Sequence, residues 1–154
     1  MEGTGNYYLI AHLRILTGFT DRTVRNYLAS GVLKGEKING LWHFTPEQVE
    51  AFINLPAVRT GIAAKQRAMA DDFLLNRFRS EPETCLILDL PGTDRKTVAE
   101  YFCFRIGQDG IRDLAFSLDV YNGINRVILK GRPCEVLQLV NDFAAAFPEA
   151  WHKA

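Results

Sequence analysis

The spacing of the apolar residues changes along this chain, and that change limits its fold more than any other feature. Before residue 80 apolar side chains recur every three or four positions, as Leu9, Leu13 and Leu16 do, which is the period of an amphipathic helix. After a polar stretch that contains Pro82, apolar residues stand in short runs or alternate with polar ones, which is typical of strands. The sequence therefore predicts a helical first half and a second half that contains a sheet.

The first two predicted helices are joined by a short turn. A helix covers residues 7–16, and Thr17-Gly18 ends it, because glycine suits the tight turn that follows a helix. Thr20 is placed to cap a second helix, which ends at Ser30-Gly31. Two short helices around a turn that contains glycine form a helix-turn-helix.

A β-hairpin and a third helix are predicted next. Asn39-Gly40 separates two short extended segments, and this dipeptide is the strongest local signal for a hairpin because both residues tolerate a positive φ. Thr45, Pro46 and Gln48 then make a good helix start, with a cap, a proline in the first turn and a capping box. A helix-turn-helix followed by such a hairpin is a winged helix-turn-helix.

A long helix is predicted over residues 58–78. At about 1.5 Å per residue it would be roughly 30 Å long. It would serve as a spacer or pack antiparallel against the same helix of a second subunit.

Beyond this helix the elements are predicted in the order β-α-β-β-α, with two helices on one face of an antiparallel sheet. The segment 94–106 is expected to be helical, but its aromatic residues also suit a strand, so both alternatives stay open. A second Asn-Gly turn, Asn122-Gly123, joins the last two strands. The fold class is mainly α with a small α+β part. The predicted divisions are a winged helix-turn-helix (1–55), a linking or dimerisation helix (56–80) and an α+β domain (81–154).

The overall charge is balanced, with 18 basic and 18 acidic side chains, so only the local distribution of charge is informative. Between Arg14 and Lys37 basic residues outnumber acidic ones. A local excess of this kind is what a nucleic-acid-binding surface requires.

The segment LTGFTDRTVRNYLASGVL resembles the DNA-binding domain of the MerR family of regulators. The features that carry the resemblance are Thr17-Gly18, Arg25 with Tyr27, and Gly31-Val32-Leu33. The resemblance implies a winged fold over about a third of the chain and binding to double-stranded DNA. The chain departs from the family pattern in its hairpin, where His43 stands in place of a basic wing residue.

In such a fold the second helix enters the major groove, where arginine contacts guanine or phosphate and asparagine pairs with adenine. Tyr27 would donate its hydroxyl to a phosphate while its ring packs against the wing, and the wing would contact flanking phosphates. The alternatives are that Tyr27 and Trp42 are simply core residues and that Arg25 forms a surface salt bridge. The predicted DNA-binding residues are Arg14, Thr20, Arg22, Thr23, Arg25, Asn26, Tyr27, Lys34, Lys37 and His43.

Several other classes of function are not expected. Cys85, Cys103 and Cys134 are odd in number and far apart, which argues against a disulfide framework, a zinc site or metal sensing. We find no catalytic motif or acid–base cluster, so we expect neither an enzyme nor a cofactor. A turn at residues 90–94 could bind an anion at a helix start, but a lone turn of this kind is more often structural. No membrane span or signal peptide is evident, and we expect a cytoplasmic protein.

The sequence thus favours a dimeric, sequence-specific transcriptional regulator. Its second half would pair subunits or bind an unidentified small-molecule or protein effector. The alternative is an architectural or protein-interaction adaptor with an excisionase-like winged helix that recognises little DNA sequence.

Overall fold

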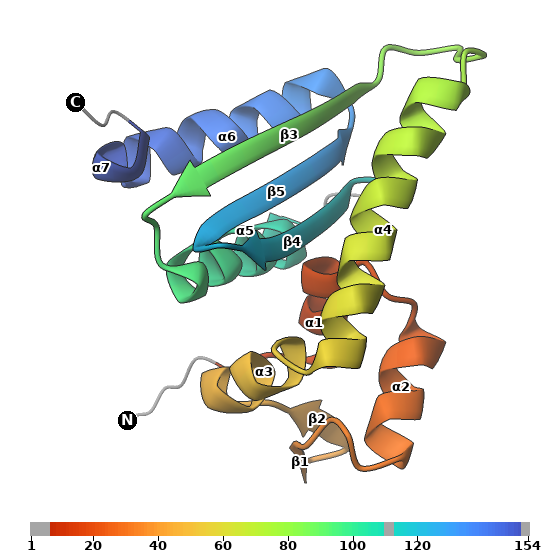
Figure 1. Cartoon of the computed structure of the whole chain (residues 1–154), viewed down its shortest axis with the longest axis vertical. Coiled ribbons are helices and arrows are strands. Elements are labelled where there is room, and N and C mark those ends of the chain that lie inside the picture. Colours follow the sequence, from red (N-terminus) through yellow and green to blue (C-terminus); the bar gives the residue numbers. More distant parts are fainter. Residues whose placement is uncertain (1–6, 110–112, 152–154) are drawn as a thin grey trace.

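The computed structural model describes residues 7–109 and 113–151 (Figure 1). Its first half contains two helices, a hairpin and two further helices, in the predicted order. Their bounds are α1 Ile10–Thr17, α2 Asp21–Ala29, β1 Glu36–Ile38, β2 Leu41–His43, α3 Pro46–Ile53 and α4 Pro56–Leu75. The second half has the predicted order β-α-β-β-α and one extra short helix. These elements are β3 Thr84–Pro91, α5 Arg95–Asp109, β4 Ala115–Tyr121, β5 Ile124–Gly131, α6 Pro133–Ala146 and α7 Pro148–Trp151.

Residues with a positive φ form both hairpin turns, as predicted. In the first hairpin Asn39 and Gly40 have φ values of 51° and 82°. In the second, Asn122 and Gly123 have values of 51° and 74°. Glycine and asparagine reach these values at low cost, so the local sequence fixes where each hairpin reverses.

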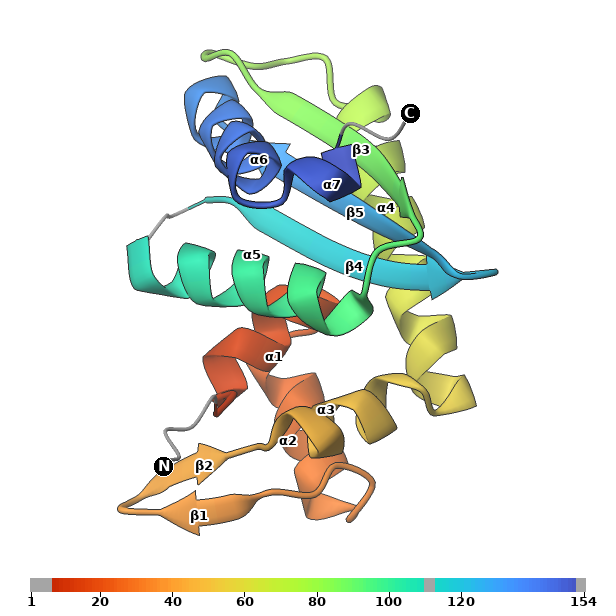
Figure 2. The ribbon, with the colours of Figure 1, turned by 90° about the vertical axis from the view of Figure 1, so that its left-hand side faces the viewer.

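The three longer strands form an antiparallel sheet with β5 in the middle, in the order β3-β5-β4. Helices α5 and α6 cover one face of this sheet, and α4 crosses the other face (Figure 2). On the face toward α5 and α6, Leu86, Leu129 and Phe116 lie in register across the three strands. The sheet is therefore the middle of three layers, which agrees with two helices on one face and adds α4 on the other.

Helix α1 belongs to both halves of the molecule. It packs against α5 and β4, and its Leu13 and Leu16 are buried. Next to it, the Tyr8 ring centroid lies 5.1 Å from that of Phe104 on α5. The buried residues of the two halves form one continuous cluster, so no polar boundary separates the helix-turn-helix from the sheet.

Three details complete or correct the expectations. The segment for which helix and strand both stayed open is helical: α5 covers Arg95–Asp109, and Asp94 caps its start by accepting a hydrogen bond from the Thr97 N–H at 3.2 Å. The long helix ends at Leu75 and not at residue 78, and Phe78 is 95% exposed. Asn76 is extended there, and Arg79 turns back to donate to the Phe73 carbonyl oxygen. Helix α7 was not predicted.

Candidate nucleic-acid interface

The turn between α1 and α2 is held by a buried threonine. The Thr17 hydroxyl donates to the Leu13 carbonyl oxygen at 2.6 Å and accepts from the Phe19 N–H at 3.0 Å. Gly18 follows α1 with a φ of 79°, and its N–H bonds the Arg14 carbonyl oxygen. A buried hydroxyl with both partners satisfied favours a single geometry. The angle between α1 and α2 is therefore fixed locally.

Helix α2 presents a polar face to the outside. Its start is capped by Thr20, whose hydroxyl accepts from the Thr23 N–H at 3.1 Å. Val24 is fully buried under the helix. Arg22, Arg25 and Asn26 are exposed on the other side. This exposed face carries hydrogen-bond donors of the kind that contact base edges and phosphates.

Arg25 already has a partner within its own helix. Its Nε lies 2.6 Å from a carboxylate oxygen of Asp21, and the two side chains are 58% and 47% exposed. An exposed pair of this kind contributes little to stability. Breaking this ion pair therefore costs little free energy, and the guanidinium can exchange Asp21 for another anion.

Three of the predicted basic residues line one shallow cavity of about 300 Å³ between α1, α2 and the hairpin. Arg14 comes from α1, Arg25 from α2 and Lys37 from β1, and Leu41 and Trp42 complete the wall on the hairpin side. The cavity also contains Asp21, which is the only acidic residue among those that line it. Cations that converge from three elements on a concave surface concentrate positive potential there.

The hairpin has an aromatic and apolar surface as well as a charge. The Lys37 Nζ lies 6.0 Å from the centre of the Trp42 ring, within the range of a cation–π contact. Leu41 beside it is 58% exposed. His43 is half-buried against Tyr7, with ring centroids 4.8 Å apart, and its Nδ1 is enclosed without a hydrogen-bond partner.

Tyr27 packs between α2 and α3. Its ring is half-buried, 5.2 Å from Phe52 of α3 and 6.1 Å from Phe19, measured between centroids. These contacts agree with the alternative that Tyr27 belongs to the core, and packing of its ring against the wing stays a prediction. Tyr27 thus joins α2 to α3.

The ten predicted residues fall into two groups. Seven are exposed: Arg14, Thr20, Arg22, Arg25, Asn26, Lys34 and Lys37. Three are half-buried: Thr23, Tyr27 and His43. The sequence did not indicate that Leu41 and Trp42 line the same cavity as the arginines. Strand alternation would have placed these adjacent residues on opposite faces of the hairpin, so no signal in the sequence points to this feature.

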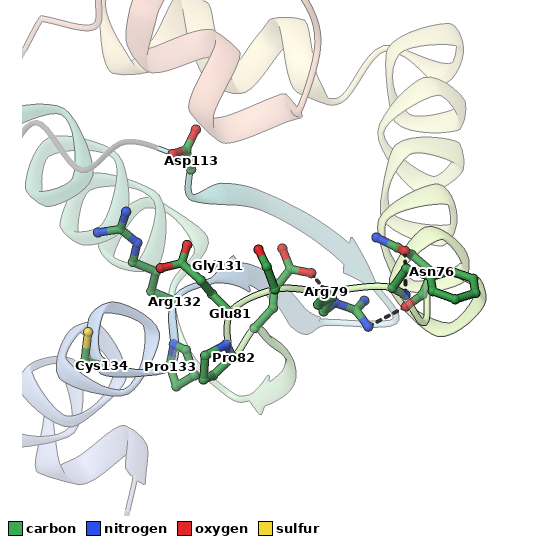
Figure 3. A pocket seen from close by; sticks show the side chains of 12 residues that line it. Asn76, Arg79, Glu81, Pro82, Asp113, Gly131, Arg132, Pro133 and Cys134 are labelled. Atoms are coloured by element: carbon green, nitrogen blue, oxygen red, sulfur yellow. Dashed lines mark hydrogen bonds and ion pairs between the residues drawn. The ribbon is translucent and has the colours of Figure 1, made fainter.

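A larger cavity, of about 610 Å³, lies at the opposite end of α4 (Figure 3). The loop that follows α4 forms one side of it, and Arg79 holds that loop by an ion pair to Glu83 at 2.7 Å. Arg132 and Cys134, at the start of α6, lie on the other side. Its lining mixes charged residues such as Glu81, Asp113 and Arg132 with apolar ones such as Phe78, Pro82 and Pro133. It therefore carries more charge than a typical small-molecule site, which is mostly apolar with a few polar groups.

Other expectations concern ligands. In the chain from 7 to 109 and from 113 to 151, no three His, Cys, Asp or Glu side chains form a group that could hold a metal ion. At the turn of residues 90–94, the Asp94 carboxylate occupies the start of α5. A carboxylate at that place competes with an external anion. No helix within these same residues is both long and apolar enough to span a membrane.

Comparisons with models of protein families, with curated proteins and with solved structures gave no match to this chain.

Proposed function

We propose that the chain is a sequence-specific, DNA-binding transcriptional regulator of the winged helix-turn-helix class, similar to MerR-type proteins. It binds double-stranded DNA as a homodimer, with α2 in the major groove and the β1–β2 hairpin beside it. The observation that carries this proposal is the convergence of Arg14, Arg25 and Lys37 on one concave surface. Side chains from three elements can then contact neighbouring phosphates while Arg22 and Asn26 contact bases.

The second half of the chain has one of two roles in this proposal: it pairs subunits, or it senses an effector. The cavity at the end of α4 is lined by acidic and basic side chains as well as apolar ones, so an effector bound there would carry polar groups. Exposed apolar side chains on the sheet and on α6, such as Ile87 and Leu137, favour the pairing of subunits.

The test is fluorescence anisotropy of a labelled duplex titrated with the full chain over a series of salt concentrations. The logarithm of the affinity falls linearly with the logarithm of salt concentration, and the slope counts phosphate contacts. We expect Arg25→Ala and Lys37→Ala each to weaken binding and to reduce the slope by about 1. Lys96→Ala is the matched control, because Lys96 is an exposed cation at the start of α5.

A selection from random duplexes follows, to test whether one sequence is preferred. A regulator binds its selected site roughly 10³-fold or more tighter than unrelated DNA. Failure of the wild-type chain to bind any duplex at low salt contradicts the proposal. Equal weakening by Lys96→Ala contradicts the assigned surface.

The second candidate is an architectural or protein-interaction adaptor. Two observations favour it: Leu41 is 58% exposed on the hairpin, and Asp21 holds Arg25. Under this alternative, the hairpin contacts protein and binding to DNA depends on salt but not on sequence. Selection without enrichment of any site, together with a measurable salt slope, is the result that supports the adaptor over the regulator.

A further inference from the structure

The sheet has two edge strands, β3 and β4, and within the described residues each pairs with β5 alone. Strand β4 packs against α1 and α4, whereas β3 packs less extensively, against α6 and α7 (Figure 2). The outer side of β3 is therefore the open edge of the sheet. An open edge strand presents a row of backbone N–H and C=O groups that have no partner in the sheet.

Strand β3 has few of the features that usually prevent such an edge from pairing. Those features are charged side chains, prolines and bulges. In its sequence TCLILDLP the only charged residue is Asp89, and the only proline, Pro91, is the last residue. The strand pairs continuously with β5 along its whole length. On the face toward α4, its Ile87 is 53% exposed.

Helix α6 continues this uncharged surface on the other face of the sheet. Leu137, Asn141 and Ala144 are spaced by four and three residues, so they form one stripe along the helix. Leu137 is 50% exposed. The stripe that faces α5 is different, since Asp142 there accepts from Arg105 at 2.6 Å. Because α6 contacts both β5 and β3, the uncharged stripe lies on the side of the open edge.

We propose that two copies of the chain pair antiparallel through their β3 edges, so that the two sheets become continuous. The uncharged stripes of the two α6 helices then contact each other. A two-fold axis makes the same surface serve on both copies, and an edge strand paired with itself satisfies its free backbone groups in both copies. The occupant of this edge is therefore a second copy of the chain.

The charges on β3 fit this pairing. Asp89 is bonded to both nitrogens of the Arg126 fork, at 2.7 and 2.8 Å, so it brings no unpaired charge to the interface. In a register centred on Ile87, Asp89 faces Cys85 of the other copy. The two Asp89 side chains are then about 13 Å apart along the strands. Contact between the α6 stripes buries no charge.

This inference deepens the proposed function by naming the surface of the dimer, and it rests on that function only for the use of the dimer on DNA. A dimer carries two winged units and matches DNA sites made of two related halves. Pairing through β3 does not involve DNA, so it is measured without DNA and can fail independently of DNA binding.

The experiment is sedimentation equilibrium of the full chain, without DNA, over a wide range of concentration. We expect the wild type to have the mass of a dimer and Leu137→Glu to have the mass of a monomer. Leu74→Glu is the matched control, because Leu74 is 69% exposed on α4. That control is expected to remain a dimer, and loss of the dimer in Leu74→Glu but not in Leu137→Glu overturns the proposal in favour of α4.

Hydrogen exchange at the β3 amides provides a second measurement. In the wild type we expect the β3 amides to be protected more strongly as concentration rises, and in Leu137→Glu we expect this dependence to be lost. If circular dichroism shows that Leu137→Glu does not fold, Asn141→Glu replaces it, since Asn141 is exposed on the same stripe. A wild type that stays monomeric, or β3 amides that do not respond to concentration, overturns the proposal.

Discussion

Arg25 forms an ion pair with Asp21 in its own helix, and this pair lies in the cavity where the proposed DNA contacts converge. Asp21 therefore has two opposed roles. As an acidic residue in the first turn of α2 it stabilises the helix by about 0.3–1 kcal/mol. As an anion next to the proposed phosphate positions, it opposes binding.

Asp21→Asn is expected to separate these roles. The change frees Arg25 and removes a negative charge, so affinity for duplex DNA should rise several-fold while the thermal midpoint falls slightly. Anisotropy and thermal denaturation measure the two effects on the same samples. Weaker DNA binding by a folded Asp21→Asn chain would contradict the assigned surface.

His12 is a second residue with a specific consequence. Its Nδ1 accepts the Leu9 N–H at 2.9 Å at the start of α1, and its ring packs edge-on against Phe104 at 4.8 Å. Burial lowers the pKa of His12 below its ordinary value. The folded chain thus stabilises the neutral form of the imidazole, because protonation of Nδ1 would remove the acceptor for the Leu9 N–H.

The sign of the pH effect follows from that lowered pKa. At a pH between the pKa of His12 in the folded chain and its pKa in the unfolded chain, the unfolded chain binds more protons. The contribution of His12 to the free energy of unfolding is therefore fully present above about pH 6.5 and is lost as the pH falls through the pKa of the folded chain. We expect the free energy of unfolding to fall in this window for the wild type. His12→Asn keeps an acceptor but cannot titrate, so the decrease in the free energy of unfolding should be absent in this variant. An unchanged pH dependence in that variant would assign the effect to another group.

At the scale of elements, the two hairpins offer a matched pair of substitutions. Gly40 and Gly123 have similar φ values, 82° and 74°, and a Cβ at either position would meet no atom within 4 Å. The cost of alanine at each is therefore backbone strain alone, on the order of 1–2 kcal/mol.

Gly40→Ala and Gly123→Ala are expected to lower the free energy of unfolding by similar amounts. Only Gly40→Ala should weaken DNA binding, because only the β1–β2 hairpin belongs to the proposed interface. Urea unfolding and anisotropy are the measurements. Equal effects of both variants on DNA affinity would mean that the hairpin acts only through overall stability.

The elements predicted from the sequence match the structure where local chemistry determines them. Thr45 caps α3 with Gln48 in a reciprocal capping box, at 3.1 and 3.0 Å, and Asp94 caps α5. These signals lie within three or four residues of the helix start that they determine.

Features that depend on distant residues could not be predicted in this way. The sequence did not indicate that α1 packs on β4 or that Tyr27 meets Phe52. Helical spacing predicts Leu137 on the inner face of α6, and this prediction is wrong, since Leu137 is 50% exposed while Leu139 is buried. Helical spacing identifies an apolar face but not the element that it contacts. The same limit applies to the candidate site, where the exposed cations were predicted but the cavity that joins three of them was not.

At the scale of the whole molecule, the shared core predicts that both halves unfold together. The two tryptophans report on different halves, since Trp42 lies in the hairpin and Trp151 in α7. We expect the single-tryptophan variants Trp42→Phe and Trp151→Phe to give the same urea midpoint by fluorescence, because α1 is buried against the sheet. Circular dichroism of each variant is the control for a change in overall stability. Two separate midpoints in variants of equal stability would show that the predicted division into 1–55 and 81–154 describes independent domains.

The position of α1 also limits how this architecture can acquire a new binding specificity. In a protein of loosely joined modules, recombination can replace a whole recognition unit. Here such a replacement would remove the helix that covers β4 and α5 and leave apolar surface of the sheet layer in water. Under the proposed function, new specificity can therefore arise by point substitution on the outer face of α2, where Arg22 and Asn26 are exposed, but not by the exchange of residues 1–55 as a unit.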